Sequence, residues 1–176
     1  MIHQYPAYNA TVASESAQPG ARDSASPLPA ETKFPSGGAE VNGLQLSLYT
    51  PHEVKAGSNL PAVLRLRTTR SSAITLLSDD NPSGVDYDFT VTTGDGKPVL
   101  PRPDYVKMIT RISRETIDAE HPSLMAVDLN KRFDLVPGMY RIHAVRSLNE
   151  VVVAGDRFTS RVLTTIVSNT VELIVD

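Results

Sequence analysis

The sequence predicts an all-β protein, built as an antiparallel β-sandwich of about seven to nine strands behind a flexible N-terminal arm. Three observations lead to this prediction. Short runs in which apolar and polar residues alternate, the period of a strand with one buried face, recur through residues 41–176. Clusters of turn-forming residues separate the runs, and no long segment has the period of an amphipathic helix. The third is a stretch with the pattern of a tyrosine corner.

That stretch, residues 134–145, reads Asp-Leu-Val-Pro-Gly-Met-Tyr-Arg-Ile-His-Ala-Val. Pro137 sets φ to about −65°, and Gly138 accepts a positive φ, so the pair suits the two central positions of a type II turn. Apolar residues then alternate with others, beginning with Tyr140 and Ile142. We therefore expect the ring of Tyr140 in the core and its hydroxyl bonded to the backbone a few residues upstream.

Residues 1–40 differ in composition from the rest of the chain, because Ala, Ser, Pro and Gly dominate them. Such a segment has too little apolar surface to offset the entropy lost on ordering. We therefore assign residues 1–40 to a flexible arm and residues 41–176 to one sandwich domain.

The alternating runs define the expected strands of this domain. They are residues 44–49, 62–68, 73–77, 87–92, 97–100, 125–129, 140–145, 150–154, 161–167 and 171–175. Residues 101–122 fit two interpretations, a helix that begins at Asp104 or an extended segment. We favour an extended segment with one helical turn near Asp104, because strands surround it.

Composition bounds the classes of function. The 176 residues include 17 basic and 20 acidic side chains, a net charge of −3, so neither nucleic acid nor an anionic membrane is an expected partner. Cysteine is absent, which excludes disulfides and thiol chemistry. No apolar run approaches the ~18 residues of a membrane span, and no signal peptide is visible in the sequence as written.

One acidic cluster is a weak candidate for a Ca²⁺ site. Asp79, Asp80, Asn81, Asp86 and Asp88 place five oxygen-bearing side chains within ten residues, and Ca²⁺ takes six to eight oxygen ligands. The spacing of an EF-hand is absent, and Asp and Asn are ordinary turn residues, so we favour a solvated loop. We expect no cofactor and no catalytic residues, since no nucleophile elbow, phosphate-binding loop or metal-ligand spacing occurs.

Two segments resemble known families. Val85-Asp-Tyr-Asp-Phe-Thr-Val, followed by Gly96-Lys-Pro-Val99, resembles a strand and hairpin of the bacterial intracellular proteinase inhibitor family. Residues 128–140, together with Ser168-Asn-Thr-Val-Glu-Leu173, resemble Ig-like modules of uncharacterised exported bacterial proteins. The resemblances cover most of residues 44–176. They imply an Ig-like sandwich and slightly favour export, with Phe89, Pro137, Gly138 and Tyr140 in structural roles.

These observations favour a non-enzymatic binding or structural module, with a surface or adhesive role, whose partner is another protein or a second copy of the chain. The resemblance alone suggests one alternative, a proteinase inhibitor that acts through an exposed loop. A carbohydrate-binding module is a further alternative, although an aromatic content of 6% without Trp offers few rings for stacking on sugars.

Overall fold

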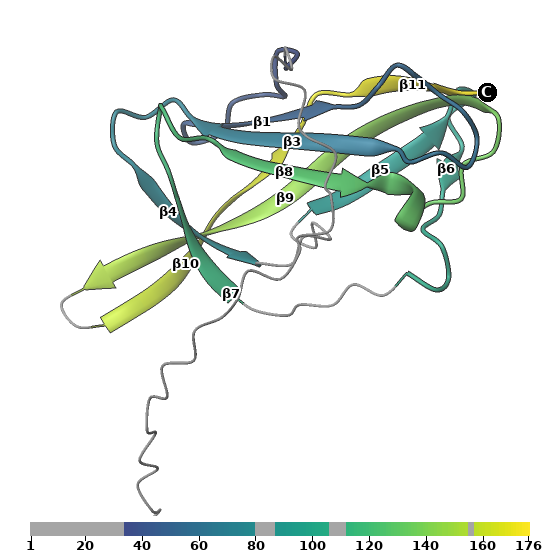
Figure 1. The fold of residues 1–176 in the computed structure, drawn as a ribbon. Coiled ribbons are helices and arrows are strands. Elements are labelled where there is room, and N and C mark those ends of the chain that lie inside the picture. Colours follow the sequence, from purple (N-terminus) through teal and green to yellow (C-terminus); the bar gives the residue numbers. More distant parts are fainter. Residues whose placement is uncertain (1–33, 80–86, 106–111, 155–156) are drawn as a thin grey trace, which may run out of the picture. The chain divides into compact units, whose positions relative to one another are not determined.

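The computed structural model describes residues 34–79, 87–105, 112–154 and 157–176, and in these ranges the chain is almost entirely β (Figure 1). The prediction of an all-β antiparallel sandwich is confirmed. The strands are β1 (Leu44–Tyr49), β2 (Glu53–Val54), β3 (Pro61–Thr68), β4 (Ile74–Asp79), β5 (Tyr87–Thr93), β6 (Pro98–Val99), β7 (Ile112–Ile117), β8 (Ser123–Asp128), β9 (Gly138–Ala154), β10 (Arg157–Val167) and β11 (Val171–Val175), with one 3-10 turn, η1 (Leu129–Lys131).

The strands form two sheets. The smaller sheet has the order β1-β3-β8 and is antiparallel throughout. The larger sheet has the order β2-β11-β9-β4-β7, and it also contains β5, which pairs with β6 and β9, and β10, which pairs with β9. Its one parallel pair among the described strands is β2–β11. Four strands therefore pair with β9, which makes it the central strand of the domain (Figure 1).

The core lies between the two sheets, where the alternating apolar residues meet. On β9 the buried side chains include Tyr140, Ile142, Ala144 and Leu148, while Met139 on the opposite face is 57% exposed. The facing strands supply a layer of fully buried leucines, namely Leu44, Leu46, Leu48, Leu64 and Leu66. Each such burial is worth about 1.5–3 kcal/mol, so the period of two in the sequence selects the sandwich.

A side-chain amide joins the two sheets at the edge of β1. Asn169, between β10 and β11, donates from Nδ2 to the Leu48 carbonyl (3.0 Å) and accepts from the Leu48 amide at Oδ1 (2.8 Å). The same edge receives a hydrogen bond from the Gly38 amide to the Leu46 carbonyl (2.9 Å). The outer edge of β1 is therefore covered, as edge strands of soluble proteins usually are.

Contacts with the domain begin before residue 41, the expected boundary of the arm. The ring of Phe34 lies 4.4 Å from the Arg65 guanidinium carbon, and the side chain of Gln45 donates to the Gly38 carbonyl. A Cβ at Gly38 would lie 2.0 Å from the Val167 carbonyl oxygen, so only glycine fits at this approach of two backbones. Residues 34–40 thus pack against the sandwich. Residues 1–33 of the predicted arm lie outside the described residues.

Two local predictions need correction. Gly138 has φ +155° and is the first residue of β9, whereas the third position of a type II turn needs about +80°, so the predicted type II turn does not form. The runs at 140–145 and 150–154 belong to one continuous strand, Gly138–Ala154. In the ambiguous segment, residues 112–117 are extended as favoured, in β7, and Asp104 lies in a turn closed by the Tyr105 amide and the Arg102 carbonyl (3.0 Å). Residues 106–111 of this segment lie outside the described residues.

Candidate binding surface

A tyrosine corner fixes the loop that leads into β9. Tyr140 is 4% exposed, and its hydroxyl donates to the Val136 carbonyl at 2.6 Å, which confirms the predicted upstream backbone bond. Pro137, at a bend, and Gly138 lie between Val136 and Tyr140, and both are exposed. Because the hydroxyl holds the carbonyl inward, the side chain of Val136 remains on the surface, 63% exposed.

Three loops meet at this end of the sandwich. The Gly94 amide donates to the Met139 carbonyl (2.7 Å), which places the β5–β6 hairpin beside the start of β9. The Arg102 amide donates to the Arg132 carbonyl (2.7 Å), which places the segment after β6 beside η1. Figure 1 shows β6, η1 and the start of β9 together at one end of the strands.

This end exposes large apolar side chains. Leu100 is 78% exposed, Val136 63% and Met139 57%. Five large apolar side chains are exposed among those the structure describes. Of these three, Leu100 follows β6, Val136 lies in the loop before β9, and Met139 is the second residue of β9. We call them the apolar loop end. An exposed apolar group rimmed by polar residues is typical of an interaction site.

A buried arginine holds these loops in place. Arg132, directly after η1, is 4% exposed, and its Nη1 donates to the Tyr87 carbonyl (2.9 Å). Its guanidinium carbon lies 4.9 Å from the centre of the Phe89 ring and 5.1 Å from that of Tyr105. Burial lowers the pKa of Arg132, and the charges of Tyr105 and Asp88 act in the opposite direction. Each desolvated contact of this kind is worth up to about 2 kcal/mol, so Phe89 and Tyr105 anchor their segments to η1.

A second buried arginine lies further along β9. Arg146, 2% exposed, donates from Nη1 to the Tyr87 hydroxyl (3.0 Å), and the Tyr87 ring lies 5.0 Å from its guanidinium carbon. Its Nη2 is 3.6 Å from Glu115 Oε2, a distance that allows charge attraction but is too long for a hydrogen bond. A guanidinium stays protonated at all ordinary pH, so Arg146 offers charge and hydrogen bonds rather than acid–base chemistry.

The structure places only part of the acidic cluster proposed for Ca²⁺. Asp79 ends β4, opposite Ile112, and Asp88 is exposed on β5, opposite Val145. Asp80 and Asp86 lie outside the described residues. Within the ranges that the structure covers, no three His, Asp or Glu side chains gather in a way that could hold a metal ion. The Ca²⁺ site therefore stays a prediction.

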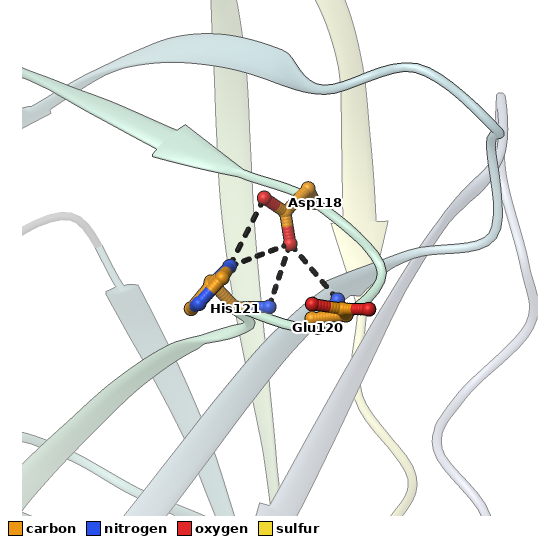
Figure 2. Close-up of polar contacts among 3 residues, drawn as sticks. All are labelled: Asp118, Glu120 and His121. Atoms are coloured by element: carbon orange, nitrogen blue, oxygen red, sulfur yellow. Dashed lines mark hydrogen bonds and ion pairs between the residues drawn. The ribbon is translucent and has the colours of Figure 1, made fainter.

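Among the described residues, one exposed carboxylate with several hydrogen bonds belongs to a turn at the other end of β3 and β8. Figure 2 shows Asp118 accepting from the amides of Glu120 (2.9 Å) and His121 (2.7 Å) and from His121 Nδ1 (3.0 Å). The His121 side chain and then the two backbone amides lower the pKa of Asp118. These bonds fix the connection between β7 and β8, which accounts for the cluster without a catalytic role.

Sequence reasoning did not find the two buried arginines. A signal existed for Arg146, since it continues the inward alternation of Tyr140, Ile142 and Ala144. None existed for Arg132, because it follows a 3-10 turn and its aromatic partners are distant in sequence.

Comparisons with known proteins place the chain in no group. No protein-family model matches the sequence, and no curated protein matches it. Among the described residues, no helix is long and apolar enough to cross a membrane. The class of the protein is therefore given by its fold, a two-sheet β-sandwich, and the resemblances noted in the sequence remain predictions.

Proposed function

We propose that the protein is a non-catalytic module that binds another protein through its apolar loop end. The observation that carries this proposal is the exposure of Leu100, Val136 and Met139 at one end of the sandwich. Loops held by a rigid sheet scaffold are a common place for binding residues. Protein interfaces usually have an apolar centre with a polar rim, and the exposed Asp95–Lys97 ion pair (2.9 Å) lies in the adjoining hairpin.

The rigidity of this end supports the proposal. The Tyr140 hydroxyl bond and the Arg132 contacts order the loops before any partner arrives. A preorganised surface loses less conformational entropy on binding, so more of the energy of apolar burial appears as affinity. Full burial of each large apolar side chain contributes about 1.5–3 kcal/mol.

The proposal that the module is non-catalytic rests on the partners of Asp118 and Arg146, which belong to the domain itself. Asp118 is engaged by a turn, and Arg146 faces Tyr87 and Glu115 inside the domain. A carbohydrate-binding role is not favoured, because such sites usually stack sugar rings on exposed aromatic side chains. Among the aromatic side chains whose exposure the structure describes, each is buried or half-buried. Reproducible turnover of any hydrolase or transferase substrate, abolished by one polar-to-Ala change, would overturn this part.

Site-specific photo-crosslinking in the native host tests the binding surface. A benzophenone amino acid replaces Met139 in one variant and Ser72, an exposed residue of the β3–β4 turn, in the control. We expect a discrete protein adduct at position 139 and none at position 72. Excess unlabelled protein should suppress the adduct, whereas excess Leu100→Asp/Val136→Asp protein should not. No adduct at position 139, or equal suppression by both competitors, would contradict the proposal.

A further inference from the structure

Two arginines lie on the outer face of β3 in the smaller sheet, and a third follows that strand. Arg65 and Arg67 are two residues apart on β3, so both point away from the core, where Leu64 and Leu66 are fully buried. Arg70 follows β3 and folds over the start of β1, because a Cβ at Gly43 would lie 2.6 Å from Arg70 Cγ. We call these three residues the β3 arginine patch.

The patch has no acidic partner among the described residues. Arg67 Nε donates to Gln45 Oε1 (2.8 Å), and Arg70 Nε donates to the Asn42 carbonyl (2.9 Å), so both meet neutral acceptors. Arg65 lies under the Phe34 ring, and its Nε is buried without a hydrogen-bond partner. Three other arginines lie beside carboxylates: Arg102 beside Asp104, Arg141 beside Glu172 and Arg146 beside Glu115.

This arrangement is electrostatically unfavourable for the isolated protein. Burial and the neighbouring charge of Arg67 lower the pKa of Arg65. The whole chain has a net charge of −3, so the patch also runs against the overall sign of the protein. An anionic partner would relieve the repulsion and satisfy the unused guanidinium donors.

We propose that the β3 arginine patch binds an acidic segment of another protein in extended conformation, with carboxylates at alternate positions. Alternate side chains of a strand are about 6.6–6.8 Å apart, and those of an extended peptide have the same spacing, so two carboxylates can face Arg65 and Arg67 together. Leu124, opposite Arg65 on β8 and 49% exposed, offers an apolar contact beside them. This surface is separate from the apolar loop end, and the inference goes beyond the function proposed above.

The observations favour a polypeptide over a nucleic acid. Nucleic-acid binding draws on many cations, and its affinity comes mainly from neutralised phosphates. The patch has three arginines in an acidic protein, and its outward neighbours on β1 and β8, such as Gln45 and Leu124, are uncharged. A short acidic peptide matches this limited charge.

Fluorescence polarisation with a synthetic probe tests the proposal. The probe is a labelled peptide of four Glu-Thr repeats, and the control peptide has Gln in place of Glu. The full chain should bind the Glu-Thr peptide at low salt and lose affinity as salt rises. Arg65→Gln/Arg67→Gln should weaken binding about 2- to 20-fold, the effect of losing two exposed ion pairs. Arg141→Gln, a matched change on the larger sheet, should leave binding unchanged.

The remaining outcomes would overturn the proposal. These are equal affinity for the Glu-Thr and Gln-Thr peptides, equal loss in the Arg141→Gln protein, or tighter binding of single-stranded DNA of the same charge. Arg67→Glu is a further variant that should fold normally, since Arg67 is exposed. It should weaken peptide binding more than Arg67→Gln while the urea midpoint of the protein is unchanged, and a failure to do so would also count against the patch.

Discussion

Removal of the Tyr140 hydroxyl tests the structure of the apolar loop end. In Tyr140→Phe the Val136 carbonyl loses its donor at 2.6 Å. A net hydrogen bond is worth about 0.5–1.5 kcal/mol, so we expect a loss of ~1 kcal/mol. Tyr140→Ala also opens a cavity beneath the loop and should cost ~3–5 kcal/mol. Met139→Ala, on the exposed face of β9, should cost less than either.

Urea unfolding followed by far-ultraviolet circular dichroism gives these values, and it avoids tyrosine fluorescence, which the substitutions alter. With a slope of about 2 kcal/mol per molar urea, the midpoint should fall by ~0.5 M in Tyr140→Phe and by ~2 M in Tyr140→Ala. Equal, negligible shifts in Tyr140→Ala and Met139→Ala would mean that Tyr140 does not face the core, and the reasoning about this end would fail.

Three further changes test the remaining contacts. Asn169→Ala removes both hydrogen bonds to the Leu48 backbone and should cost ~1–3 kcal/mol in urea unfolding. The cost of Asn169→Asp should lie between those of the native protein and Asn169→Ala. An unchanged midpoint in Asn169→Ala would contradict the link between the sheets. Gly38→Ala places a Cβ against the Val167 carbonyl and should cost ~1–3 kcal/mol by the same measurement. An unchanged free energy of unfolding would show that residues 34–40 do not pack as described. The lowered pKa of Asp118 means that its contribution is present above the pKa of the unfolded chain and is lost as pH falls through the lower folded-state pKa. Melting temperature should therefore fall more steeply below about pH 4 in the native protein than in Asp118→Asn, and parallel curves would refute this assignment.

The fold was predictable where one face of a strand is continuously apolar. The leucines of β1 and the alternation from Tyr140 to Ala144 predicted their buried faces correctly, because a shift of one residue would expose every one of them. The hydroxyl bond of Tyr140 was predictable for a related reason, since a buried hydroxyl needs a partner and the preceding loop supplies the nearest carbonyl.

Local turn chemistry was less informative. Pro137 and Gly138 satisfy a type II turn, but glycine is also compatible with the φ of +155° that it adopts at the start of β9. The continuation of β9 past Val145 was missed because Arg146 looks like a surface residue. Its charge is accommodated inside by Tyr87 and Glu115, which lie far from it in sequence.

The candidate surfaces depend on long-range contacts that one sequence does not reveal. Nothing near Arg132 in the chain indicates that it lies between the Phe89 and Tyr105 rings. Exposure of Leu100 is likewise decided by the loop around it, whereas the sequence pattern predicts a strand over residues 97–100. The β3 arginine patch was visible only as alternating residues, since the lack of carboxylates among the described neighbours of Arg65 depends on which strands lie beside it.

The apolar loop end depends on the pairing of β9, which nuclear Overhauser effects measure most directly. In the folded protein Tyr140 is opposite Thr93 of β5 on one edge and opposite Leu173 of β11 on the other. We predict backbone contacts from Tyr140 to both residues, because opposite residues of antiparallel strands have Cα atoms about 4.5–5.5 Å apart. Direct cross-strand Hα–Hα or amide–amide contacts that place Tyr140 opposite a neighbour of Thr93 and of Leu173, instead of these residues, would shift the register and bring Met139 to the core face. That result would contradict the placement of the apolar loop end.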